Sequence, residues 1–386
     1  NGFRTEQGLI ALLSGFPAQP ANTVIRHFGK FENLPHIGRI LLENGYSNNY
    51  YYSGNLDYAN TKSYLLSGGF SKIIGDEQKW KTKTQWGAYD EEIFDYHLKH
   101  SNGDKQPFFS IIMTSTNHEP FEAKVKKVFK GKGTDIDYKN TSYYTDRCIV
   151  NYLKQAKQKE WYNNTLFVIV SDHAHSYPQH RANNEPERYH IPMIFFGEVI
   201  KPEYKGTVID KTSSQVDFPS ILLNQMGIDS DAFVWSKNLF AKNPPQFAFY
   251  TFDNGFGIIS PNKYIVYDHN LKKVVLDINR NNYITDTNLV KQGKAYLQIL
   301  IDEFINLDNK TKKLFMLKTD IKNIILTKAD EKFSLLSNIN FGISEGKVYT
   351  ILGKNGSGKT TLIKSLTKLL DTKIFNINAD VYWYDK

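Results

Sequence analysis

The sequence has only one cysteine, Cys148, among its 386 residues. A single thiol cannot form an internal disulfide or a cysteine-based zinc site, so neither can stabilise the fold. Long apolar runs are also missing. Residues 166–170 and 191–196 are typical of those present, whereas a membrane-spanning helix needs roughly 18 apolar residues. We therefore expect a disulfide-free chain with no segment that crosses a bilayer.

Clustered charge is likewise absent, although the net charge is +8 and the isoelectric point is about 9.0. The lysines are spread along the whole chain, which is typical of a solvated surface and does not predict a nucleic-acid partner. Hydrophobic residues make up 40% of the sequence, enough for two or three packed domains. The chain begins at Asn1 without a signal-peptide pattern, so we interpret it as a fragment.

Residues 1–307 have the pattern of an α/β domain. Short apolar runs of strand type alternate with helix patterns, and the run 166–170 is apolar on both faces, as in a central parallel strand. We expect a mostly parallel sheet flanked by helices, with an antiparallel subdomain packed on its edge. The expected strands are 108–113, 166–170 and 191–196, the expected helices are 33–44, 143–159 and 287–307, and the antiparallel hairpins begin at Gln246.

A second pattern begins at Met316, after a charged linker at 308–315. We expect strands at 323–327 and 347–352 on either side of a turn at 335–346. A Gly-rich loop and a helix pattern at 361–370 follow. The sequence therefore predicts a partial P-loop NTPase α/β piece over residues 316–386.

The segment SDHAH directly follows the run 166–170 and contains Asp172 and His173. In a parallel sheet, ligands bind beyond the carboxyl ends of the strands, where these two residues fall. A carboxylate oxygen and an imidazole suit Mn²⁺, Zn²⁺ or Mg²⁺. The alternative is that Asp172 caps a following helix and His173 is a surface residue.

Two other segments bring similar chemistry. TSTNHEP places His118 beyond the end of the strand at 108–113, and FRTEQGLIALLSG places Thr5 at the start of a predicted helix. A helix N-terminus favours an anion, so a metal-bound hydroxyl there would be an activated nucleophile. The alternative for Thr5 is a plain N-cap.

Longer blocks follow one another in a distinctive order: FRTEQGLIALLSGFPAQP, NGYSNNYYYSGNLDYANTKSYLLSGGFSKIIG, TSTNHEPF, YYTDRCIVNYL, SDHAH, RYHIPMIFFG and SSQVDFPSILLNQMGI. Together, over residues 1–307, they resemble the extracellular catalytic domain of the lipoteichoic acid synthase-like family, part of the alkaline phosphatase/sulfatase superfamily. The resemblance implies an alkaline-phosphatase-like fold. It also implies a metal-dependent phosphoglycerol transferase or phosphodiesterase that acts on membrane phospholipids or glycans of a bacterial envelope, membrane-anchored and outside the cytoplasm.

By this resemblance Thr5 corresponds to the nucleophile, and Thr5, Asp172 and His173 correspond to ligands of a divalent metal, usually Mn²⁺, with Zn²⁺ or Mg²⁺ as alternatives. His118 corresponds to a catalytic residue that contacts the transferred phosphoryl group. The expected substrate-binding residues are His118, Asp57, Asn60 and His190.

Two departures from the family pattern matter. The usual tryptophan and arginine of the substrate pocket are replaced by Ala59 and Thr61, which leaves the headgroup open. The family's glutamate ligand at the end of a first strand has no counterpart, because the sequence begins at Asn1. We therefore expect an exposed apolar sheet edge and little or no catalysis by the chain as given.

Sulfuryl transfer is the competing chemistry on this fold. Sulfatases form their nucleophile from a Cys or Ser in a C/S-x-P-x-R setting, whereas Cys148 lies in TDRCIVNYL and the nucleophile position holds Thr5. Phosphoethanolamine transferases also use threonine but typically carry several disulfides. The sequence favours phosphoryl transfer, with a sulfatase as an alternative.

The segment GKNGSGKTT matches the phosphate-binding motif G-x-x-x-x-G-K-[ST]. Its glycines let backbone N–H groups surround the β-phosphate, Lys359 reaches the β/γ oxygens, and Thr360 coordinates Mg²⁺. An ordinary Gly-rich turn is the alternative. The predicted ATP-binding residues are Gly353, Asn355, Gly356, Gly358, Lys359, Thr360 and Thr361.

Through LLSNINFGISEGKVYTILGKNGSGKTTLIKSLTKLL, residues 316–386 resemble the N-terminal part of an ABC-transporter ATP-binding domain. The resemblance implies ATP and Mg²⁺ binding in the cytoplasm, with a transporter membrane subunit as partner only for a complete domain. The segments that supply the catalytic glutamate and the switch histidine are missing, so we expect no hydrolysis.

The two halves suggest an accidental join. The first resembles a domain without its beginning, the second a domain without its end, and Met316 resembles a start residue. We expect two neighbouring genes joined by read-through or an assembly error. The alternative is a nucleotide-binding fusion whose first domain is degenerate.

Overall fold

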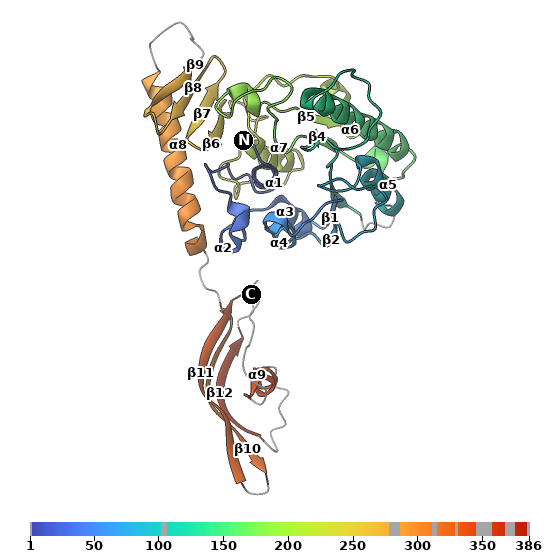
Figure 1. Cartoon of the computed structure of the whole chain (residues 1–386). Helices are drawn as coiled ribbons and strands as arrows, with labels where there is room; N and C mark the ends of the chain where they lie inside the picture. The colour runs from blue at the N-terminus through green and yellow to red at the C-terminus, as the bar shows by residue number, and fades with distance from the viewer. Residues whose placement is uncertain are drawn as a thin grey trace. The chain divides into compact units, whose positions relative to one another are not determined.

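The computed structural model describes residues 2–101, 106–277, 286–310, 315–328, 331–344, 357–366 and 375–383. The chain divides into two compact units, residues 1–308 and 309–386, both drawn in Figure 1. The division falls inside the predicted linker. Leu307, just before the linker, is buried, and the first linker residue, Asp308, pairs with Lys30 at 2.7 Å. The start of the linker is therefore attached to the first unit.

The first unit contains a parallel sheet in the order β2–β1–β3. The central strand β1 (Ser47–Tyr52) pairs with β2 (Lys72–Ile74) and with β3 (Phe108–Met113). Its tyrosines Tyr50 and Tyr51 are fully buried. The strand predicted at 108–113 and the parallel sheet are thereby confirmed.

The other two predicted strands form a separate pair. β4 (Phe167–Val170) runs antiparallel to β5 (Met193–Phe196), so the prediction of a central parallel strand here is wrong. Parallel neighbours need a crossover connection, usually a helix. The chain between these strands contains no α-helix, only the 3-10 helix Pro186–Tyr189, so it returns antiparallel.

Both β3 and β4 are paired on one edge only, within the residues that the structure describes. Every residue of these two strands is half-buried despite its apolar sequence. Both strands therefore present partly exposed apolar side chains.

Helices pack around these strands (Figure 1). α5 contacts β1, β3 and the long helix α6, whereas α1 contacts α3 and α7. The predicted helix at 33–44 is shorter than expected, and the one predicted at 143–159 begins nine residues earlier, at Thr134. The helices are α1 (Thr5–Ser14), α2 (Phe28–Phe31), α3 (Ile37–Glu43), α4 (Thr61–Ser67), α5 (Asp90–His100), α6 (Thr134–Ala156) and α7 (Phe218–Gln225).

The rest of the first unit is an antiparallel four-stranded sheet followed by α8 (Thr287–Asn306). α8 lies along this sheet in Figure 1 and contacts β7 and β8. The predicted antiparallel subdomain and its closing helix are confirmed. The strands are β6 (Ala248–Phe252), β7 (Gly255–Ser260), β8 (Lys263–Asp268) and β9 (Lys273–Asp277).

The second unit is an antiparallel sheet in the order β11–β10–β12 with the helix α9 (Lys359–Leu366). β10 (Phe315–Lys328) contains the predicted strand 323–327, and β12 spans Phe375–Trp383. The turn predicted at 335–346 is wrong, because β11 (Glu331–Ser344) runs through most of it. Its apolar residues Leu336, Ile339 and Phe341 pack on the small core, although Asn, Ser and Gly surround them in the sequence. The strand predicted at 347–352 lies outside the described residues.

In neither unit does the described part of the chain include a helix long and apolar enough to span a bilayer.

Candidate functional site

Thr5 is the first residue of α1, and its hydroxyl is directed away from the helix. The N-cap position is occupied by Arg4, whose backbone is extended (φ −138°, ψ 146°). The Thr5 Oγ1 donates a hydrogen bond to Asp172 Oδ2 at 2.6 Å, a contact between residues 167 positions apart. Thr5 is therefore not a plain N-cap, and its hydroxyl meets the predicted metal-binding segment.

Close packing of α1 on the backbone of Asp172 produces this contact. A Cβ atom at Gly8, one turn after Thr5, would overlap the Asp172 carbonyl oxygen. The same carbonyl accepts a hydrogen bond from the Gln215 side chain at 2.6 Å, and Gln215 also donates to Ser171 O at 2.9 Å. Gly8 and Gln215 thus hold the Asp172 segment against the helix that carries Thr5.

Asp172 and His173 present two donor atoms to the same point. The His173 Nδ1 lies 2.9 Å from the Ala174 carbonyl oxygen, which can only accept, so Nδ1 carries the proton. This leaves the Nε2 lone pair 3.6 Å from Asp172 Oδ2. Two ligands of one metal ion, each bound at about 2.1 Å, stand roughly 3–3.5 Å apart, so the pair fits a shared cation.

The structure does not support the alternatives for this pair, in which Asp172 caps a helix and His173 is a surface residue. No helix follows Asp172 for it to cap, since the next helical residue is Pro186. The Asp172 Oδ1 instead accepts the His173 N–H at 2.9 Å. The His173 side chain is only 19% exposed, so it is not an ordinary surface residue.

The donors that meet here are the Thr5 hydroxyl, the Asp172 carboxylate and the His173 imidazole. Within the described residues, no cluster of three or more His, Cys, Asp or Glu side chains could bind a metal, so any cation here would rely on the hydroxyl as its third ligand. Oxygen and imidazole donors suit Mn²⁺ or Zn²⁺.

The loop that carries His118 is linked to the segment of Asp172 and His173 through the pair Glu119–His175. His118 follows the end of β3, its Nδ1 donates to the Glu119 carbonyl oxygen at 2.8 Å, and its ring packs on Trp86 at a centroid distance of 4.2 Å, tilted by 37°. The Glu119 carboxylate lies 3.4 Å from Nε2 of His175. Burial lowers the pKa of His175, and the charge of Glu119 opposes this shift.

The remaining histidines of this loop differ in setting. His175 stacks on Tyr138 and Tyr177, each at an interplanar angle of 21°, and is half-buried. His180 is exposed and bonds Asp135 of α6 at 3.0 Å. His190 is also exposed. It stands three residues before Met193, the partner of Val170, so antiparallel pairing brings it to the edge where Asp172 lies.

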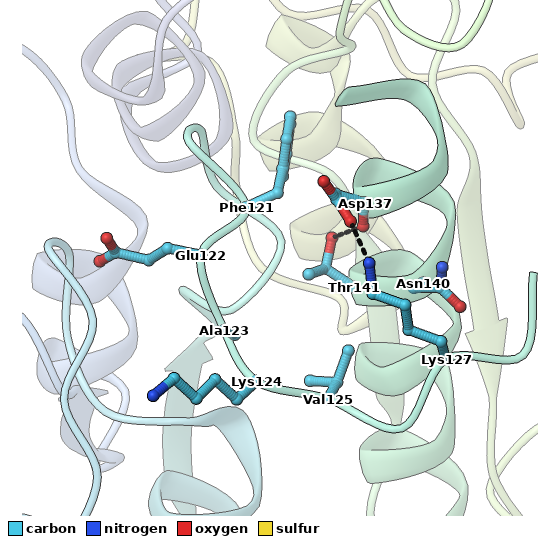
Figure 2. A pocket seen from close by; sticks show the side chains of 9 residues that line it. All are labelled: Phe121, Glu122, Ala123, Lys124, Val125, Lys127, Asp137, Asn140 and Thr141. Carbon is cyan, nitrogen blue, oxygen red and sulfur yellow. Dashed lines mark hydrogen bonds and ion pairs between the residues drawn. The ribbon is translucent and has the colours of Figure 1, made fainter. Parts of the chain in front are cut away.

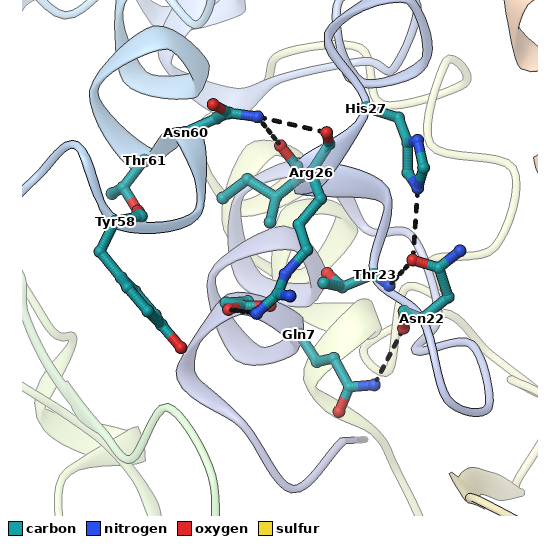
Figure 3. A network of polar contacts seen from close by, with 10 residues as sticks. Gln7, Asn22, Thr23, Arg26, His27, Tyr58, Asn60 and Thr61 are labelled. Atoms are coloured by element: carbon teal, nitrogen blue, oxygen red, sulfur yellow. Dashed lines mark hydrogen bonds and ion pairs between the residues drawn. The ribbon is translucent and has the colours of Figure 1, made fainter.

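Asp57 and Asn60 flank a strained turn. Figure 3 shows the side chain of Asn60. Asn60 has a left-handed backbone (φ 59°), as does Ala59 (φ 53°). The Asn60 amide donates to the carbonyl oxygens of Ile25 and Arg26 at 3.4 and 3.2 Å, which gives it a structural role. Asp57 is exposed, and substrate binding by either residue stays a prediction.

Four residues near the site were not anticipated. Glu6 follows Thr5 directly and is buried; its carboxylate accepts hydrogen bonds from Nη2 and Nε of Arg26 at 2.6 and 3.1 Å. Tyr58 contacts Trp86 edge-on at 6.2 Å. The position of Glu6 beside Thr5 is the one signal in the sequence that could have indicated this group.

A cavity of about 280 Å³ lies between residues 121–127 and α6 (Figure 2). An exposed ion pair crosses it, from Lys127 to Asp137 at 3.1 Å. None of the predicted site residues lines this cavity, so it is separate from the Thr5–Asp172 contact.

Only part of the predicted ATP site is described. Gly358 has a left-handed backbone (φ 85°), and α9 begins at Lys359 with Thr360 and Thr361 in its first turn. This is the order a phosphate-binding loop requires at a helix N-terminus. Gly353, Asn355 and Gly356 lie outside the described residues.

Comparison with known proteins gives two family matches. The Sulfatase family model matches residues 1–228, and the ABC transporter model matches the short segment 336–380. Two curated relatives are each 27% identical: lipoteichoic acid synthase 1 of Bacillus subtilis, over 175 residues, and the lipoteichoic acid synthase of Staphylococcus aureus, over 201 residues. These alignments cover 41% and 48% of this chain but only 27% and 30% of the relatives.

Solved structures resemble the first unit. An alkaline phosphatase superfamily protein from Vibrio parahaemolyticus matches with a TM-score of 0.65 and 24% identity, covering 80% of this chain and 77% of the other. A lipoteichoic acid synthase from Listeria monocytogenes matches with a TM-score of 0.61 and 13% identity, covering 80% and 82%. The predicted alkaline-phosphatase-like fold is confirmed.

Proposed function

The chain belongs to the sulfatase family, and we propose that its first unit is a metal-dependent phosphoryl-ester transferase or phosphodiesterase with Thr5 as nucleophile. The observation that carries the proposal is the 2.6 Å hydrogen bond from Thr5 to Asp172. It joins a hydroxyl at a helix N-terminus to a carboxylate beside an imidazole. Such an arrangement activates a hydroxyl and stabilises negative charge next to it.

The chemistry would proceed in two steps. Thr5 Oγ1 attacks the phosphorus of a phosphodiester, which forms a Thr5 phosphoester and breaks the bond to the leaving alcohol. The Thr5 proton passes to water, since the Asp172 carboxylate would be a ligand of the cation. A hydroxyl acceptor or water then attacks the same phosphorus and releases Thr5, which recovers a proton from water.

His118 would handle the other proton. Because its Nδ1–H is bonded to the Glu119 carbonyl, its Nε2 is the atom available to substrate. In the protonated ring, Nε2–H gives its proton to the departing alcohol, and the neutral ring takes one from the incoming hydroxyl.

A divalent cation held by Thr5, Asp172 and His173 would lower the pKa of the Thr5 hydroxyl and offset charge on the phosphoryl oxygens.

The relatives suggest the substrate. Two curated relatives and one structural neighbour are named lipoteichoic acid synthases, so we propose a phosphoglycerol group of a membrane phospholipid or envelope glycan, handled outside the cytoplasm of a bacterium. The chain spans less than a third of the curated relatives' length, so the activity of the whole protein is part of this proposal.

Sulfate-ester hydrolysis is the second candidate, favoured by the family match. Cys148 cannot serve it, because the thiol is buried in α6 and burial raises its pKa to about 12. Thr5 occupies the position that meets Asp172, and a threonine does not yield the sulfatase nucleophile. We therefore favour phosphoryl over sulfuryl transfer.

For the second unit we propose ATP and Mg²⁺ binding through Gly358, Lys359 and Thr360. The support is the helix start at Lys359 and the ABC transporter match. Because this match covers a short segment, hydrolysis is not part of the proposal.

The decisive test is a covalent adduct. The chain with Mn²⁺ is incubated with bis(4-nitrophenyl) phosphate or 4-nitrophenyl sulfate, and intact-mass spectrometry follows. We expect a phosphoryl adduct on Thr5 from the diester and none from the sulfate. One turnover suffices to form it, so the test works even at the low rate that the sequence predicts. An adduct from the sulfate, or no adduct from the diester, would contradict the proposal.

A further inference from the structure

We propose that Arg26 binds a second anionic group of the substrate, a phosphate other than the one that Thr5 attacks, and that Tyr58 and Trp86 form the wall between this subsite and His118. The inference rests on the proposed function, because it assumes that Thr5 marks the reacting centre. It begins from the contact between Arg26 and the residue next to Thr5.

Arg26 is held rigidly beside the nucleophile. Its guanidinium gives two hydrogen bonds to the Glu6 carboxylate, the geometry that fixes both position and plane of an arginine. Glu6 raises the pKa of Arg26, first through the hydrogen bond and then through its charge. Glu6 lies at the second position of α1, so the locked guanidinium stands beside the residue that carries the reacting hydroxyl.

The backbone under Arg26 is equally constrained (Figure 3). The Asn60 amide donates to the Arg26 carbonyl, and the Arg26 N–H bonds the Thr23 carbonyl at 3.2 Å. Gln7 and His27 both contact Asn22 in the same turn. The charge is thus presented from a fixed support, which lowers the entropy lost on binding an anion.

Arg26 is much more exposed to solvent than its partner Glu6. The Glu6 side chain is 5% exposed and that of Arg26 48% exposed, so the carboxylate lies beneath and the guanidinium faces solvent. A guanidinium has five N–H groups, and the bonds to Glu6 use one on Nε and one on Nη2. The end of the guanidinium, with one N–H on Nη1 and the second N–H on Nη2, remains suited to the two oxygens of a phosphate.

An aromatic wall connects this charge to the predicted catalytic histidine. Tyr58 interacts electrostatically with Arg26 and contacts Trp86 edge-on at 6.2 Å, and Trp86 packs on His118 at 4.2 Å with the two rings tilted by 37°. Arg26 and His118 therefore lie at the two ends of a series of contacts, with the rings of Tyr58 and Trp86 between them. The carbons of glycerol or a sugar can pack on these rings.

The proposed subsite also bears on the replacement of two expected pocket residues in this sequence. Ala59 and Thr61 stand where the resemblance leads us to expect an aromatic side chain and an arginine. Tyr58 and Trp86 now provide rings and Arg26 a guanidinium, each from a different segment of the chain. A substrate with repeated phosphate groups would use both the reacting centre and this second charge.

The first experiment measures binding without turnover. Sulfate is titrated into the full chain by calorimetry at constant ionic strength, for the unmodified chain and for Arg26→Gln, Arg26→Lys and Arg147→Gln. Arg147 is an exposed arginine on α6 and controls for loss of one positive charge. We expect Arg26→Gln to weaken sulfate at least tenfold, Arg26→Lys to weaken it less, and Arg147→Gln to leave it unchanged. Equal loss in both Gln variants would contradict a specific subsite.

The second experiment separates the subsite from the reacting centre. The rate of nitrophenolate release in a single turnover is measured against concentration for bis(4-nitrophenyl) phosphate and for a 4-nitrophenyl diester whose alcohol carries a second phosphate. We expect Arg26→Gln to raise the half-saturating concentration at least tenfold for the second compound only, with the maximal rate retained. An equal change for both compounds, or none, would overturn the inference. Sulfate binding at Arg26 without release from either compound would contradict the proposed function instead.

Discussion

The two units of the chain support their candidate sites in different ways. In the first, Thr5 and Asp172 come from segments 167 positions apart, and folding brings their side chains to 2.6 Å. In the second, all predicted ligands fall within residues 353–361, one continuous motif. A contact across most of a unit cannot arise from a motif alone, so the fold adds independent support to the first site. The second site depends on sequence pattern and on where α9 begins.

The largest effect is expected at Thr5. Thr5→Ala should lower nitrophenolate release by about 10³-fold or more and abolish the adduct, because the nucleophile is removed. Thr5→Ser should retain part of the activity. Thr207→Ala provides the control, since the Thr207 hydroxyl bonds only the Tyr204 carbonyl in an exposed turn. An adduct of equal yield in Thr5→Ala would place the nucleophile elsewhere.

Asp172 tests whether the long-range contact binds metal. Asp172→Asn keeps the size of the side chain but removes the charge that a cation needs, so we expect Mn²⁺ affinity to fall by about 100-fold or more. Plasma emission spectrometry after dialysis gives metal per chain. Asp137→Asn, which breaks the exposed pair with Lys127, is the control. Unchanged metal content in Asp172→Asn would remove Asp172 from the ligand set.

Much of the first site was predictable from sequence because strand ends are readable. The run 108–113 and the run before SDHAH place His118 and Asp172 beyond two strands, and both strands exist. The direction of β5 was not readable, since an apolar run has the same pattern in either orientation. It depends on the lack of a crossover helix between β4 and β5.

Other parts of the site depend on packing that leaves little trace in the sequence. Arg26 contacts Glu6 from a turn whose backbone is held by a hydrogen bond from Asn60. Trp86 contacts His118, which lies 32 positions later in the sequence. In the second unit, β11 has apolar residues that pack on a core formed by β10 and α9, but its Asn, Ser and Gly content is typical of a turn. Tertiary packing decided both cases.

We expect the stability of the first unit to depend on pH through the buried His36. Burial lowers the pKa of His36 to about 3, with a smaller effect of the Arg39 charge. Its Nδ1 accepts the Gly38 N–H at 3.0 Å at the start of α3. Unfolding restores a pKa near 6.5, so the stability that neutral His36 provides is complete above that pH and is lost as pH falls toward 3.

From pH 7 to pH 5 we therefore expect the unfolding free energy of the first unit to drop by about 2 kcal/mol through His36. His36→Asn keeps an acceptor for Gly38 and should remove this part of the slope. Urea melts at the two pH values, monitored separately for each unit by hydrogen exchange, measure it. An unchanged pH slope in His36→Asn, or a matching slope in the second unit, would contradict this assignment.

The smallest expected effect tests the second site against the first. Lys359→Ala should weaken MgATP binding by roughly tenfold, because the lysine ammonium no longer reaches the β/γ-phosphates. Lys364→Ala, on the same helix, is the matched control and should bind MgATP as the unmodified chain does.

Both lysine variants should form the Thr5 adduct normally, and Thr5→Ala should bind MgATP normally, since each unit has its own core. Fluorescent nucleotide displacement on the full chain provides the affinities. If the unmodified chain binds no nucleotide, the motif is an ordinary Gly-rich turn. If Thr5→Ala alters nucleotide binding, the two units form one functional system rather than an accidental join.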